Sequence, residues 1–147
     1  MLKMEKKMDA YTQILELNAR FAWLIDHQDG DGVAELFTQD GIYGFGEKQA
    51  IGRDQINGFY QMRKNRGLRQ SRHLFSNPVV LNQSENSISA CCVLTLFAFD
   101  GEGPHPADIH LIADYQDEFV RDDQGIWRYE SRVIQPIFGH VPNLTEK

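Results

Sequence analysis

The chain has 147 residues and a formal net charge of -6, with 41% hydrophobic and 24% charged residues. This length suits a single domain over residues 1–147, and the composition excludes a disordered or fibrous chain. The negative charge argues against a nucleic-acid partner, because phosphate binding needs a basic patch. No stretch approaches the roughly 20 consecutive apolar residues of a membrane span, so we expect no membrane partner and a cytoplasmic location.

Two clusters of residues carry further information, one on the cellular compartment and one on the surface. Cys91 and Cys92 are adjacent in a β-pattern, so their side chains point to opposite faces and form no ordinary disulfide with each other. Two buried free thiols suit a reducing compartment. One stretch concentrates the basic residues, which we interpret as a solvated surface or as a site for anion recognition: Arg63, Lys64, Arg66, Arg69 and Arg72.

The first predicted element is an amphipathic helix from about Met8 to Gln28, with apolar residues at three- and four-residue steps. Asp26 lies on the edge of this stripe, in the last turn. The helix C-terminus carries partial negative charge and an apolar surrounding disfavours ionisation, so we expect a raised pKa for Asp26. A raised pKa would suit a general base. The alternatives are that Asp26 caps the following loop or pairs with an arginine.

The next segment predicts two more helices and a short strand. A short helix is expected from about Gly32 to Phe37, followed by a strand from Ile42 to Phe45 after the Asp40-Gly41 turn signal. A third helix is expected from about Arg53 to Lys64, ending before Gly67.

Beyond Gly67 the hydrophobic period changes to that of β-strands. Short polar or glycine-bearing turns separate the strands, which indicates an antiparallel meander. Three helices followed by a curved antiparallel sheet predict an α+β fold, with the helices on one face of the sheet. The residues from about 141 are expected to form a loose tail. The predicted strands are Leu74 to Asn82, Ser87 to Phe99, Ile109 to Arg121 and Ile126 to Phe138.

The second of these strands, Ser87 to Phe99, is nearly all apolar, where a sheet with one buried face would alternate. We therefore expect both of its faces to be covered. Helices can cover only one face, so the other is predicted to pack on a second subunit in a homodimer or homotrimer.

The order of elements and several motifs resemble the SnoaL-like branch of the nuclear transport factor 2-like superfamily, which has a cystatin-like fold. The resemblance implies a cone-shaped pocket formed by the curved sheet and closed by the helices. The matching stretches are Asp26 to Asp29, Leu36 to Tyr43, Gly52-Arg53, Arg72 to Pro78, Tyr115 to Phe119, Gly125 to Arg128, and Arg132.

The resemblance also implies a site and a reaction type. Asp26 matches a carboxylate on the first helix of dehydratases of this superfamily, and His73 matches their histidine on the first long strand. Tyr43 matches a substrate-binding tyrosine. The implied function is a cofactor-independent dehydratase, isomerase or cyclase that acts on a hydrophobic aromatic or polycyclic small molecule.

The predicted catalytic pair is His73 with Asp26. Asp26 would hold the imidazole in one tautomer, and His73 would take a proton from carbon and return it to a leaving oxygen or a neighbouring carbon. The alternative is a structural histidine, hydrogen-bonded within a loop-to-strand junction.

Further polar side chains are predicted to bind the substrate. Tyr43, Asn77 or Arg132 could stabilise an oxyanion. Tyr115 and Asp117 share one strand face, and two interpretations stay open for them: a polar pocket wall, or an internal ion pair between Asp117 and Arg132.

The sequence gives no support for a metal site or a cofactor. The five histidines show no paired ligand spacing, and the glycines around Gly44 do not follow a strand into a helix as in dinucleotide-binding motifs. A non-catalytic role is the alternative function. The chain also resembles the β subunits of ring-hydroxylating dioxygenases, which implies a ligand-binding or partner role beside a catalytic α subunit.

Overall fold

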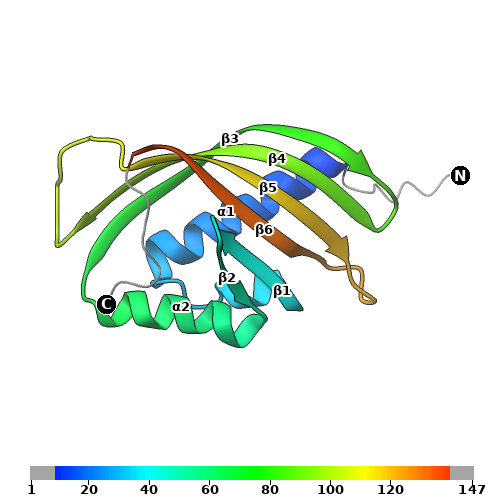
Figure 1. Ribbon diagram of the computed structural model, residues 1–147, viewed down its shortest axis with the longest axis horizontal. Helices are drawn as coiled ribbons and strands as arrows, with labels where there is room; N and C mark the ends of the chain where they lie inside the picture. Colours follow the sequence, from blue (N-terminus) through cyan, green and yellow to red (C-terminus); the bar gives the residue numbers. More distant parts are fainter. Residues whose placement is uncertain (1–8, 140–147) are drawn as a thin grey trace, which may run out of the picture.

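The computed structural model describes residues 9–139, which form a curved sheet with helices on one side (Figure 1). Neither of the two α-helices in this range is long and apolar enough to cross a membrane. The elements are α1 (Ala10–Gln28), the 3-10 helix η1 (Val33–Leu36), β1 (Phe37–Phe45), β2 (Lys48–Ile51), α2 (Arg53–Asn65), β3 (Arg69–Gln83), β4 (Ser87–Asp100), β5 (Leu111–Arg121) and β6 (Trp127–Gly139).

The six strands form one sheet in the order β2-β1-β6-β5-β4-β3. β3 to β6 pair antiparallel with their neighbours in the chain, which confirms the predicted meander. β1 pairs with β2 antiparallel and with β6 parallel. The sheet arches over α1, which lies along the concave side beneath β3 to β6, and α2 covers the end near β1 and β2 (Figure 1).

Three predictions about the fold are wrong. The described residues contain two α-helices and not three, because the second predicted helix is the four-residue η1. Gly30 and Gly32, with φ of 83° and 93°, turn the chain immediately before it, and β1 begins immediately after it at Phe37, so there is no room for a longer helix. β1 begins at Phe37 and not at Ile42, and its pairing with β6 makes the sheet mixed, not purely antiparallel.

The remaining boundaries agree closely with the predictions, except that β3 begins at Arg69, five residues early. This extension places His73 inside the strand, where its backbone is fixed by pairing with Leu96 of β4. The predicted helix start at Met8 and the predicted tail from about 141 lie outside the described residues.

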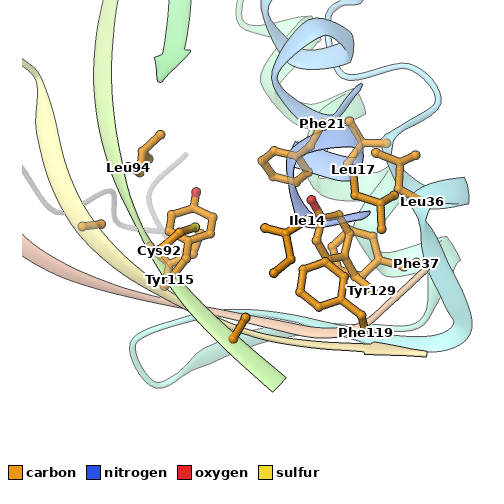
Figure 2. Packing of buried hydrophobic residues seen from close by; sticks show 14 of the residues in the cluster. Ile14, Leu17, Phe21, Leu36, Phe37, Cys92, Leu94, Tyr115, Phe119 and Tyr129 are labelled. Atoms are coloured by element: carbon orange, nitrogen blue, oxygen red, sulfur yellow. The ribbon is translucent and has the colours of Figure 1, made fainter. Parts of the chain in front are cut away.

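The core fills the space between α1 and the concave face of the sheet. Along β4, alternate side chains from Ile88 to Ala98 are buried, and those between them are half-buried. Within the single chain the outer face of this strand is only partly covered, so the predicted packing of that face on a second subunit stays a prediction. Cys92 lies on the buried face and Cys91 on the partly exposed one, and both are free. In Figure 2, Phe21 of α1 lies across the core from Cys92, Leu94 and Tyr115 of the sheet.

Candidate active site

Asp26 and His73 meet where the end of α1 packs on β3. The Oδ1 atom of Asp26 lies 2.7 Å from Nδ1 of His73. The same carboxylate accepts hydrogen bonds from the Ser71 hydroxyl at 2.8 Å and from the backbone N–H of His73 at 2.9 Å. The side chains are 5% and 10% exposed. The predicted contact is confirmed. Ser71 and His73 occupy the Asp26 carboxylate, in place of the loop cap or arginine partner that the sequence left open, and Asp29 is the C-cap of α1.

The expected raised pKa of Asp26 is wrong in direction. Burial does raise it, but hydrogen bonds from the side chain and backbone of His73 and from Ser71, with the charge of His73, outweigh burial and lower the pKa of Asp26. The helix end and the burial of Asp26 can be inferred from the sequence, but these donors are brought to it only by the fold. Asp26 is therefore an ionised acceptor near neutral pH.

The charge of Asp26 determines the tautomer of His73. An ionised carboxylate only accepts hydrogen bonds, so Nδ1 of His73 is the donor to Asp26, and in the neutral imidazole Nε2 carries the lone pair. The imidazole ring lies edge-on to Phe21, with centroids 6.3 Å apart, and is stacked on Phe75 at 6.4 Å. The basic nitrogen thus belongs to a ring held between a carboxylate and two aromatic side chains.

A second acidic and basic pair joins β5 and β6. Arg132 donates from Nε to Oδ1 of Asp117 at 2.8 Å and from Nη2 to Oδ2 at 2.9 Å. Both residues are buried, at 0% and 1% exposure. Nη2 also donates to Oδ1 of Asn18 at 2.8 Å. Of the two interpretations left open by the sequence, the structure shows the internal ion pair.

The environment of this pair keeps it ionic. Burial acts to lower the pKa of Arg132, but attraction to the Asp117 carboxylate outweighs it and the pKa is raised. Burial raises the pKa of Asp117 while the guanidinium opposes that rise, and the bidentate geometry identifies the contact as an ion pair. The guanidinium carbon also lies over four aromatic rings, at 4.2 to 4.9 Å from their centroids: Phe21, Phe75, Tyr115 and Tyr129.

Three tyrosines from different elements lie beside Arg132. Tyr43 of β1 is opposite Arg132 in the strand register, and its ring is stacked on that of Tyr60 of α2 at 6.1 Å. Tyr115 of β5 lies under the guanidinium. Burial is the largest effect on all three and raises the pKa of each, so the hydroxyls stay protonated and can donate hydrogen bonds.

Asn77 lies apart from these residues. It is exposed, with φ of 53°, in a register shift of β3 between Ser76 and Val79. This bulge changes which residues face inward, so the partly buried side chains after Phe75 are those of Pro78 and Val80. Alternation along an unbroken strand would have kept Asn77 on the same face as His73.

Three residues at the site were missed or given no role by the sequence interpretation, although each left a signal. Asn18 lies on the apolar stripe of α1, four residues after Ile14, which is an unusual place for an amide. Ser71 precedes His73 by two residues and so shares its strand face. Tyr60 lies on the buried side of α2. A polar residue on a predicted core face is the common signal.

The described residues also contain a cleft that is separate from this site. A cleft of about 580 Å³ lies between the start of α1 and the β3–β4 and β5–β6 turns, and none of the predicted site residues lines it. Within residues 9–139, no group of three or more His, Cys, Asp or Glu side chains is placed to hold a metal ion.

Comparison with known proteins identifies the family. Residues 6–133 match the family model described as a SnoaL-like domain. The chain belongs to the SnoaL-like domain family. No curated protein matches the sequence of this SnoaL-like chain.

Solved structures share the fold of this SnoaL-like chain. ActVI-ORFA from Streptomyces coelicolor is 22% identical with a TM-score of 0.75, over 87% of this chain and 96% of that one. A candidate scytalone dehydratase from Novosphingobium aromaticivorans is 20% identical with a TM-score of 0.77, over 90% and 87%. A Nostoc punctiforme protein of unknown function with a cystatin-like fold is 21% identical with a TM-score of 0.73, over 90% and 96%. These likenesses confirm the predicted SnoaL-like, cystatin-like fold, and at these identities they show the fold alone.

Proposed function

We propose that this SnoaL-like chain is a single-domain, cofactor-independent acid/base enzyme, a dehydratase, isomerase or cyclase for a hydrophobic aromatic or polycyclic small molecule. The observation that carries the proposal is the 2.7 Å contact between the lowered-pKa carboxylate of Asp26 and Nδ1 of His73. This contact leaves Nε2 of His73 as the basic atom. The similarity to proteins of the SnoaL-like family supports a small-molecule role.

The proposed mechanism is a proton transfer at His73. Nε2 takes a proton from a substrate carbon, and the charge of Asp26 stabilises the imidazolium that forms. The imidazolium then returns the proton to a leaving oxygen or to a neighbouring carbon. A positioned acid/base group of this kind contributes roughly 10²–10⁴-fold to a rate. Asn77, which is exposed on the bulge of β3, has no part in this mechanism.

The proposal is tested with His73→Gln, which keeps a polar side chain but has no basic nitrogen. The wild-type chain and the variant are assayed on a panel of aromatic and polycyclic hydroxyketones for dehydration and isomerisation. We expect His73→Gln to lower kcat/KM by roughly 10²–10⁴-fold while the melting temperature stays nearly unchanged.

Arg72→Gln is the matched control for this test. Arg72 neighbours His73 on β3 and is exposed on the opposite face, so its substitution should leave kcat/KM within about twofold. A large loss of stability in His73→Gln would identify a structural histidine. Ligand binding by the wild type without turnover across the panel would instead favour a non-catalytic role, similar to that of a dioxygenase β subunit.

We further propose that the chain forms a homodimer or homotrimer through the outer face of the sheet. Side chains from β3 and β6 leave an apolar surface there, with Leu74 53%, Val79 51% and Val133 40% exposed. Val79 and Val133 lie in one row across the sheet, through Cys91 and Gln116. Val79→Lys should lower the mass measured by light scattering to that of the single chain, and an unchanged mass would contradict this interface.

The free thiols Cys91 and Cys92 suit the reducing cytoplasm in which we propose that the protein works. Both thiols should be labelled by an alkylating reagent when cells are lysed directly into urea that contains the reagent and no reductant, which exposes Cys91 also where the outer face of the sheet packs on a second chain. Labelling that appears only after reduction would contradict this location.

A further inference from the structure

One amide side chain lies in the apolar contact between α1 and the sheet. Asn18 is only 4% exposed, and the other large buried side chains of the helix are the apolar ones of Ile14, Leu17 and Phe21. Burial of an amide costs free energy unless the amide is hydrogen-bonded. The contacts of Asn18 therefore have to explain its place on this face.

The side-chain oxygen of Asn18 accepts two hydrogen bonds from β6. The hydroxyl of Tyr129 donates to Oδ1 at 2.7 Å, and Nη2 of Arg132 donates to the same atom at 2.8 Å. A guanidinium is only a donor, so the amide must turn its oxygen toward Arg132, which fixes its orientation. Its nitrogen then faces β4, where Nδ2 lies 3.7 Å from Sγ of Cys92. The amide thus links α1 to two strands of the sheet.

These polar contacts can define the position of the helix more sharply than the apolar contacts around them. Apolar burial is non-directional, so a helix that slides or turns by a small step keeps most of it. Hydrogen bonds depend on distance and angle, and two donors on one oxygen define one position. Single buried asparagines fix the register of helices in coiled coils in the same way.

The position of the helix at Asn18 determines where Asp26 lies. Asp26 follows Asn18 by eight residues on the unbroken helix α1, about 12 Å along its axis. Its carboxylate lies 2.7 Å from Nδ1 and 2.9 Å from the backbone nitrogen of His73. A slide by one residue, about 1.5 Å, takes such contacts out of hydrogen-bond range. The helix is thus tied to β6 at Asn18 and to the edge strand β3 at Asp26.

We infer that Asn18 is a positioning residue, which fixes α1 in one register on the sheet and so holds the carboxylate of Asp26 at His73. It acts through Asp26 and not on the imidazole itself. The part of Asn18 in catalysis rests on the proposed function, whereas its effect on the position of Asp26 is a property of the fold.

The test replaces the amide and its tyrosine partner together, in Asn18→Leu with Tyr129→Phe. This double variant leaves no unpaired tyrosine hydroxyl, and Nη2 of Arg132 keeps its hydrogen bond to Asp117. The measurement is hydrogen–deuterium exchange by NMR, without substrate. It compares the backbone N–H of His73, which donates to Asp26, with that of Leu94 in the inner strand β4.

We expect the exchange rate of His73 relative to that of Leu94 to rise about tenfold or more in the double variant, because the carboxylate no longer covers the N–H of His73. In the assay panel, kcat/KM should fall by roughly 10²-fold, mainly through kcat, since the imidazole loses the group that orients it.

Two single variants are the matched controls. Tyr129→Phe alone keeps the hydrogen bond from Arg132 to Asn18 and should leave the exchange ratio within about twofold. Leu17→Ala removes apolar packing one position before Asn18, and should destabilise the chain without raising the ratio. A merely structural role for Asn18 predicts instead that Leu17→Ala raises the ratio as much as the double variant does.

An unchanged ratio in the folded double variant would overturn the inference, because Asp26 would then keep its place through its own hydrogen bonds. If the leucine overpacks the core and the chain does not fold, Asn18→Ala with Tyr129→Phe replaces it, and failure of both to fold would identify a structural residue. A raised ratio without turnover by the wild type contradicts only the proposed function, and turnover with an unchanged ratio contradicts only the role of Asn18.

Discussion

Two carboxylates in this protein each hold one basic side chain, and the basic partner gives the two pairs opposite properties. Asp26 and His73 meet at the edge strand of the sheet with a small exposed fraction, 5% and 10%. Asp117 and Arg132 lie on two inner strands and are 1% and 0% exposed. An imidazole gains and loses a proton near neutral pH, whereas a guanidinium does not.

The comparison shows that burial of a carboxylate does not by itself make a base. Asp117 is the more buried acid, yet its partner fixes it as half of a permanent ion pair. Asp26 is less buried, and its hydrogen-bond donors lower its pKa, so it serves as a fixed charge that orients His73. The arginine thus supplies a constant positive charge, whereas the carboxylate of Asp26 fixes the orientation of an imidazole.

The largest expected effect comes from breaking the inner pair, Asp117 and Arg132. Asp117→Asn leaves the guanidinium of Arg132 buried and uncompensated, and should lower the free energy of unfolding by about 3–5 kcal/mol in urea titrations. The double variant Asp117→Leu with Arg132→Met removes both charges and should regain more than half of that loss. A loss below about 1 kcal/mol in Asp117→Asn would show that the charge finds another partner.

The outer pair, Asp26 and His73, should instead make a contribution to the free energy of unfolding that depends on pH. The pKa of Asp26 is lowered in the folded state, so its ionised form stabilises the fold above the unfolded value of about 3.9, and this contribution is lost as pH falls through the lower folded pKa. We expect Asp26→Asn to be less stable by about 1.5–3 kcal/mol at pH 7, with the difference shrinking between about pH 5 and pH 2. Urea titrations across this range measure it, and a constant difference would contradict the lowered pKa.

The smallest expected effect concerns one donor of the outer pair. Ser71→Ala removes the hydroxyl that donates to Asp26 and should lower stability by about 0.5–1.5 kcal/mol. The pKa of the Asp26 carboxyl should rise, because one interaction that lowers it is lost. NMR titration of the carboxyl carbon measures this change. Ser76→Ala, on the exposed side of the same strand, should leave that pKa unchanged.

Periodicity was sufficient to predict the long elements of the fold. The apolar stripe of α1 and the turns between β3, β4, β5 and β6 are local signals, and their boundaries were close. β2 has no such signal, because Lys48-Gln49-Ala50-Ile51 is short and mostly exposed and becomes a strand only by pairing with β1. The parallel pairing of β1 with β6 depends on distant residues, and so local patterns do not reveal it.

The candidate site was predicted only in part, for similar reasons. Resemblance paired Asp26 with His73, and strand alternation placed Tyr115 and Asp117 on one face. The pKa of Asp26 required its donors, including Ser71, to be known in space. Asn77 was misplaced because the strand was taken as unbroken, although Asn tolerates positive φ and Pro78 within a strand pattern is a signal of a bulge. The stacking of Tyr60 on Tyr43 depends on how α2 packs on β1, and so local patterns do not reveal it.

The parallel pairing of β1 also bears on how the protein is made. Tyr43 pairs with Arg132 across the two strands, and roughly ninety residues of chain lie between them. Contacts between residues so far apart in the sequence form slowly in folding. On the ribosome, β1 is synthesised long before the strand that covers its edge. Arg132 can therefore pair with Tyr43 only once β6 has been made, and a chain shortened before β6 would keep His73 and Asp26 but expose a strand edge prone to aggregation.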